Sequence, residues 1–195
     1  MTGYGLDEAA ADLVLILIVG VNCYVGWRFG LVRRAIAVVA VFAGALAATY
    51  IGNPVATLVR PDDLYANAWC FVGIFAIVLV MIEILAALYA EQLRGMVTLV
   101  FDRVTGLLAG AAVGLLEAGV LFLVAQAVAD VPATAAIPVP SGHQQVAVAV
   151  DHGLLTQLVV RIEPGIQALL GPALPGSLSG RFAEPTAAVT GSPTP

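Results

Sequence analysis

The sequence has little charge and no lysine. Only 11% of its 195 residues are charged, and 13 Asp and Glu residues outnumber 8 basic residues, all of which are arginine. An average soluble domain carries about 25% charged residues, and a nucleic-acid-binding protein shows a basic patch or stripe. These shortages argue against a soluble enzyme, a disordered chain and a nucleic-acid-binding protein.

Cysteine and histidine are also scarce. Cys23 and Cys70 are too few for a disulfide framework, and each lies in an apolar run, where free cysteine behaves as a small hydrophobe. The two histidines, His143 and His152, have no cysteine or carboxylate set at metal-ligand spacing. The chain contains no Walker loop, no HExxH and no CxxC motif. We therefore expect no metal, no cofactor and no enzymatic activity.

The sequence is instead rich in apolar residues, which make up 61% of the chain and raise its mean hydropathy to +0.99. They gather in four stretches. Because about 20 helical residues cross a bilayer core of about 30 Å, each stretch is a candidate transmembrane helix. The predicted fold is an all-α membrane protein with a four-helix transmembrane bundle in residues 1–130. Its helices are expected at about 9–27, 35–52, 66–90 and 104–129.

Arginine placement predicts the orientation of the bundle, because cytoplasmic loops carry an excess of Lys and Arg. The connections after the first and third stretches hold five arginines, whereas the middle connection holds one. We therefore expect a multi-pass protein whose first and third loops are cytoplasmic and whose two termini are extracytoplasmic. The arginines in question are Arg28, Arg33, Arg34, Arg94 and Arg103 on the cytoplasmic side, and Arg60 on the other.

The composition changes after the fourth stretch. Residues 131–142 form a Pro- and Ala-rich linker that cannot continue a helix. Residues 143–170 carry an apolar stripe at helical spacing, which predicts an amphipathic helical segment on the outer membrane surface or against the bundle. Residues 171–195 are rich in Pro, Gly, Ser and Thr and are expected to form a disordered tail.

Glycines line one face of the fourth predicted helix and part of the second. Such small residues let helix backbones approach closely in a membrane. Packing inside one bundle is the favoured interpretation, and a groove or an assembly surface is the alternative. The residues are Gly106, Gly110 and Gly114 on the fourth helix, and Gly44 and Gly52 on the second.

Asp102 and Arg103 stand at the cytoplasmic mouth of the fourth predicted helix. The carboxylate of Asp102 is expected either to cap the start of that helix or to pair with Arg33 or Arg34 in the other cytoplasmic turn. Both roles are architectural, and neither offers catalytic geometry.

Glu83 and Glu117 lie inside predicted spans, where a charge costs on the order of 2.5 kcal/mol or more and usually faces protein or water. Counted from the inner helix ends, Glu83 lies roughly 10 Å deep and Glu117 roughly 20 Å deep, which argues against a direct pair. Asn22 on the first helix can offer a hydrogen bond. Structural hydrogen bonding and an ion or proton path remain open alternatives.

These motifs resemble those of the colicin V production (CvpA) family of bacterial inner-membrane proteins. Asp12, Gly30 and Arg33 look like the family's D…G..R opening, and the DR..G...G...G string that begins at Asp102 looks like its second hallmark. Val113 departs from the pattern, because family members often carry Arg there. The resemblance covers about residues 9–129 and implies a role in toxin production, toxin export or envelope homeostasis, with no cofactor or catalytic residue.

Two functions follow as hypotheses. In the first, the protein is a bacterial inner-membrane scaffold or accessory factor that assembles with itself or with other membrane or envelope proteins through its glycine faces. In the second, it is a small channel or proton-coupled transporter that uses Glu83 and Glu117. Both place the protein in the lipid bilayer.

Overall fold

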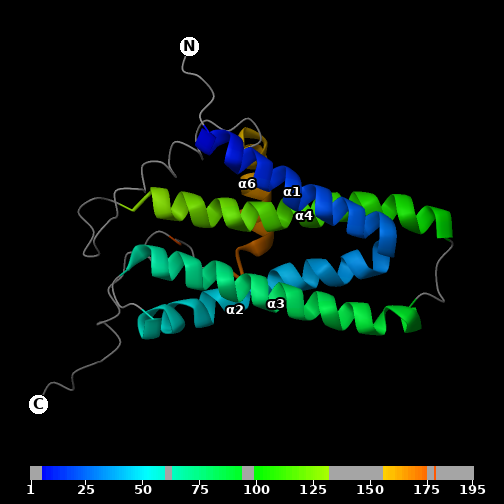
Figure 1. Ribbon diagram of the computed structural model, residues 1–195, viewed down its shortest axis with the longest axis horizontal. Coiled ribbons are helices and arrows are strands. Elements are labelled where there is room, and N and C mark those ends of the chain that lie inside the picture. The colour runs from blue at the N-terminus through cyan, green and yellow to red at the C-terminus, as the bar shows by residue number, and fades with distance from the viewer. Residues whose placement is uncertain (1–5, 60–62, 94–98, 132–155, 175–177, 179–195) are drawn as a thin grey trace, which may run out of the picture.

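The structure is a computed structural model, and it describes residues 6–59, 63–93, 99–131, 156–174 and 178. Within these residues the chain forms five helices and no strand (Figure 1). They are α1 (Leu6–Phe29), α2 (Leu31–Val59), α3 (Leu64–Leu93), α4 (Leu99–Ala129) and α6 (Thr156–Leu170).

Four of these helices are long and apolar enough to cross a membrane, which confirms the prediction of an all-helical protein with four spans. The candidate spans are Ala9–Phe29, Leu31–Val59, Leu64–Tyr89 and Asp102–Ala129. Each helix extends beyond the apolar stretch that predicted it, because backbone hydrogen bonding continues past the residues that contact hydrocarbon. In α2 the helix even continues through Pro54, whose ring removes one backbone donor.

The spans form two pairs. α1 packs along α4, α2 packs along α3, and a smaller contact between α2 and α4 joins the pairs (Figure 1). The core between them is built from small residues of α2, aromatic residues of α3 and β-branched residues of α4, including Val41, Ala45, Phe71, Phe75 and Val113. Large apolar side chains such as Leu17 on α1 and Leu88 on α3 point outward, as a surface facing lipid requires.

α6 runs across the bundle and packs against it (Figure 1). Val159, Ile166 and Leu170 are buried on its inner face, and the side chain of Ile166 occupies the space where Gly119 of α4 lacks a Cβ. Gly119 lies ten residues before Ala129, which places this contact about 15 Å from the end of α4. Of the two positions expected for the amphipathic segment, the structure has the one against the bundle.

Contacts with the bundle continue past α6 into the predicted tail. The hydroxyl of Thr49 in α2 donates a hydrogen bond of 2.9 Å to the carbonyl oxygen of Ala173, which is 1% exposed. Ala173 and Leu174, near the start of the predicted tail, are therefore packed against the helices. The predicted linker beyond Val131, the start of the amphipathic segment at 143–155, and most of the tail lie outside the described residues.

Candidate functional site: a buried polar network

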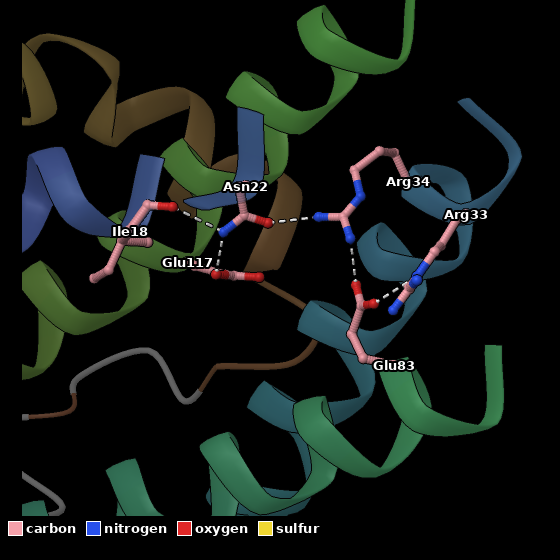
Figure 2. Close-up of polar contacts among 6 residues, drawn as sticks. All are labelled: Ile18, Asn22, Arg33, Arg34, Glu83 and Glu117. Atoms are coloured by element: carbon pink, nitrogen blue, oxygen red, sulfur yellow. Dashed lines mark hydrogen bonds and ion pairs between the residues drawn. The ribbon is translucent and has the colours of Figure 1, made fainter. Parts of the chain in front are cut away.

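A chain of hydrogen bonds and ion pairs links all four spans inside the bundle (Figure 2). Its centre is Arg34, which is 2% exposed. α2 begins directly after a one-residue turn at Gly30, where φ is +84°, a conformation that glycine adopts without strain. Arg34 thus stands one turn into α2 and faces both α1 and α3.

Glu83 of α3 binds two arginines of α2, one on each carboxylate oxygen. Arg34 Nη2 lies 2.9 Å from Glu83 Oε1, and Arg33 Nε lies 3.2 Å from Glu83 Oε2. Arg33 also lies over the ring of Phe29, 4.1 Å from its centroid, a distance suited to a cation–π contact. Sequence reasoning singled out Glu83 but did not identify these partners.

Asn22 of α1 connects the two helix pairs. Its amide oxygen accepts a 2.6 Å hydrogen bond from Arg34 Nη1, and its amide nitrogen donates to Glu117 Oε2 at 2.8 Å and to the carbonyl oxygen of Ile18 at 3.0 Å. The bond expected between Asn22 and Glu117 is therefore confirmed. Among the side chains that the structure describes, Arg34 Nε is the single buried nitrogen or oxygen without a partner.

The two glutamates do not contact each other; Asn22 and Arg34 stand between them (Figure 2). This agrees with their expected difference in depth. An asparagine amide does not titrate and an arginine keeps its proton in proteins, so the connection holds charges in place and does not by itself pass a proton. The ionisable members of the network are two arginines and two glutamates.

The glycine face of α4 packs against α1 of the same chain. A Cβ on Gly106 would run into the backbone at Gly26 and Gly30, a Cβ on Gly110 into the carbonyl oxygen of Asn22, and a Cβ on Gly114 into Val19 Cα. Sequence reasoning missed the matching surface of α1, although the small-xxx-small spacing of Gly26 and Gly30 signals it.

The glycines of α2 serve the other pair. Gly44 lies against Phe75 and Gly52 against Phe71, both on α3. Both glycine faces therefore form contacts within one chain, which is the packing alternative favoured from the sequence.

Asp102 caps a different helix from the one expected. α4 begins at Leu99, so Asp102 lies inside its first turn and does not precede it. Its Oδ1 accepts a 2.8 Å hydrogen bond from the backbone N–H of Leu31, the first residue of α2, and its carboxylate fills the space beside Gly30. The expected pair with Arg33 or Arg34 is wrong, because both arginines bind Glu83.

The remaining motif residues lie apart from this turn. Arg103 is exposed on α4, and Asp12 is buried in the opposite half of α1, 7% exposed. Cys23 and Cys70 are half-buried free thiols on α1 and α3. Both histidines lie outside the described residues, and the part of the chain that is described contains no group of three or more His, Cys, Asp or Glu side chains able to hold a metal.

Comparison with known proteins gives one family match. The sequence model of the family described as "Colicin V production protein" matches residues 11–139 of the chain. No curated protein and no solved structure matches the chain. The matched range contains three of the four spans and all but the first two residues of the other, together with the polar network and both groups of motif residues.

Proposed function

Because the chain belongs to the colicin V production (CvpA) family, we propose that it is a non-enzymatic membrane scaffold or accessory factor. Its expected task is to support toxin production, toxin export or envelope homeostasis. We place it in the bacterial inner membrane, with the Arg-bearing turns in the cytoplasm and both termini outside, following the excess of arginine in those turns.

The observation that supports a scaffold is the closure of the polar network within one chain. One terminal nitrogen of the Arg34 guanidinium donates to Asn22 of α1, and the other binds Glu83 of α3. These contacts fix the two pairs of spans against each other. A buried charge is expensive to leave without its partner. The network therefore favours one rigid arrangement of the four spans, which suits a protein that presents a constant surface to others.

Assembly with a second copy or with other membrane or envelope proteins is part of this proposal. The glycine faces are occupied by α1 and α3 of the same chain, so they would have to separate before another protein could use them. We therefore assign assembly to the outward apolar faces, such as that of α3, where Ile77, Met81 and Leu88 are exposed.

The alternative is a small channel or proton-coupled transporter that uses Glu83 and Glu117. It is favoured by their inclusion in one hydrogen-bonded network, and it is opposed by the arginine and amide that separate them. Neither of two hollows lined by described residues reaches either glutamate. A working path would need water molecules in place of the direct contacts.

One experiment separates the two functions. The full chain is purified in a mild detergent, its complexes are weighed by native mass spectrometry, and proton and cation flux is measured after reconstitution into proteoliposomes. The scaffold proposal expects defined complexes and no flux above that of empty vesicles. Wild-type flux that is lost in Glu117→Gln, a variant that keeps an oxygen for Asn22, would establish the transporter instead.

A cellular measurement completes the test. A strain lacking the protein is complemented with wild type, Glu117→Gln or Arg34→Met, and toxin release and envelope integrity are compared. A scaffold tolerates Glu117→Gln but fails with Arg34→Met, because only the second change unlocks the helix pairs. Normal complementation by Arg34→Met at equal protein level would overturn the role of the network.

A further inference from the structure

A hollow of about 320 Å³ lies between α1, α4 and α6. Its walls include Ile16, Val19 and Gly20 of α1, Leu115 and Ala118 of α4, and Val159 of α6. Every described residue that lines it is apolar. A water molecule in a protein cavity needs two to four polar partners, so water has nothing to bind in this hollow.

The depth of the hollow is set by the spans that form it. Val19 lies at the middle of the candidate span Ala9–Phe29, and Leu115 lies at the middle of Asp102–Ala129. The middle of a span coincides with the middle of the bilayer, where the ends of the lipid acyl chains meet. The hollow therefore lies at the depth of the lipid hydrocarbon.

The hollow opens towards this hydrocarbon. Ile16 is 57% exposed, and neighbouring Leu13 and Leu17 are each 62% exposed, so the opening is continuous with the surface of α1 that contacts lipid. An empty space of this size would lose dispersion contacts along all its walls. A hydrocarbon chain regains these contacts, and the absence of polar walls gives a charged or polar ligand no partner.

Gly20 supplies the space. A Cβ added to Gly20 would meet no atom within 4 Å, whereas one added to Gly26 on the same helix would run into the backbone of α4. Close packing of helices thus explains Gly26 and does not explain Gly20. The missing side chain at position 20 keeps the wall of the hollow open.

We propose that one acyl chain of a membrane phospholipid binds in this hollow. The chain lies against α1 and α4 and touches Val159, so it also supports the docking of α6 on the bundle. This is a binding site for a lipid, distinct from the polar network and independent of the assembly role.

The test uses a photoactivatable lipid and a matched pair of glycine variants. The full chain is reconstituted in vesicles of phosphatidylethanolamine and phosphatidylglycerol that contain a trace of phosphatidylglycerol with a diazirine near the end of one acyl chain. Cross-linked residues are mapped by mass spectrometry. Gly20→Leu fills the hollow, and Gly73→Leu is the control, because Gly73 of α3 has the same open surroundings but lines no part of the hollow.

The wild type is expected to show labelling concentrated on residues 15–20 and 115–118, well above that of the exposed face of α3. Gly20→Leu should reduce this labelling to the level of α3, and Gly73→Leu should leave it unchanged. Gly20→Val, a smaller change, tests the same point if the leucine variant does not fold. Equal labelling of α1 and α3 in the wild type, or labelling unaffected by a folded Gly20 variant, would overturn the proposal.

Discussion

Along the α1–α4 pair, backbone lies against backbone, whereas aromatic rings and ion pairs fill the interface of the α2–α3 pair. Gly106 and Gly110 bring α4 onto the main chain of α1 at Gly26 and Asn22. In the other pair, Phe75 fills the space beside Gly44, and Glu83 binds Arg33 and Arg34. The first interface depends on missing side chains, and the second depends on side chains that are present.

This difference has a physical basis in the membrane. Lipid tails are as apolar as the helix surfaces, so the hydrophobic effect does not drive transmembrane helices to associate. Close packing or polar contacts must hold the helices together instead. Both pairs use both means: the α1–α4 pair adds one hydrogen bond, from Asn22 to Glu117, to its backbone contacts, and the α2–α3 pair adds ion pairs to its aromatic packing. Arg34, which bonds Asn22 of α1, is where the two pairs meet.

Removal of Arg34 should have the largest effect, because it tests whether polar contacts hold the second pair and the junction. In Arg34→Met, Asn22 Oδ1 loses its donor and Glu83 keeps one arginine, and breaking a buried ion pair costs about 3–5 kcal/mol. The free energy of unfolding in mixed micelles measures this. A loss no greater than that of Arg103→Met, an exposed arginine on α4, would contradict the prediction.

The glycine contrast should give the next largest effect. Gly110→Ala forces a Cβ into the carbonyl oxygen of Asn22, and overpacking of this kind costs about 1–3 kcal/mol. The added Cβ of Gly44→Ala meets the Phe75 ring at 3.0 Å and the Phe75 carbonyl oxygen at 3.2 Å, a milder contact that small shifts of α3 can relieve. We expect a lower melting temperature for Gly110→Ala than for Gly44→Ala. Equal melting temperatures would show that the two interfaces do not differ in kind.

Asp102 tests the connection from the first pair to the start of the second. Asp102→Ala leaves the N–H of Leu31 without its acceptor, and loss of a helix N-cap typically costs about 1 kcal/mol. Asp102→Asn keeps an oxygen for this N–H and should cost less. Unfolding free energies of the two variants provide the measurement. A similar loss of unfolding free energy in both variants would show that the charge of Asp102, and not its capping hydrogen bond, stabilises the fold.

Thr49 should give the smallest effect, since it tests only the attachment of the segment after α6 to α2. Hydrogen bonds between membrane segments average about 0.6 kcal/mol, which is the loss expected for Thr49→Val. Thr57→Val is the control, because the Thr57 hydroxyl bonds to Pro54 in its own helix, in an exposed position. Protease cleavage of the C-terminal segment should become faster in Thr49→Val alone. Unchanged cleavage would remove Thr49 as an anchor.

Much of the fold could be predicted from the sequence. The four apolar stretches predicted the four spans because a helix in lipid must be apolar over the full width of the hydrocarbon. The resemblance to the colicin V production family is confirmed by the match over residues 11–139. The helix ends could not be predicted to the residue, since hydropathy records lipid contact and not hydrogen bonding.

The site was predictable only in part, because Arg34, its centre, was expected in the connection after the first helix and is instead buried in α2. Glu83, Glu117 and Asn22 stand out because polar side chains are rare in these spans. The partner of Asp102 was missed, because a capping bond from α4 to the start of α2 joins residues 71 positions apart. The place of α6 was missed in part, since its apolar stripe requires burial but does not state against which surface.

The sequence by itself determined that the protein lies in lipid and that four helices span it. It also placed few charges and several glycines at helical spacing within these spans. Only the tertiary structure decided that the glycines of α4 meet α1, that Arg33 and Arg34 of α2 both bind Glu83, and that α6 closes a hollow with α1 and α4. The reason is that composition and periodicity fix how each segment interacts with lipid. Contacts between segments depend on which helices lie side by side, and every helix here offers an apolar face to its neighbours.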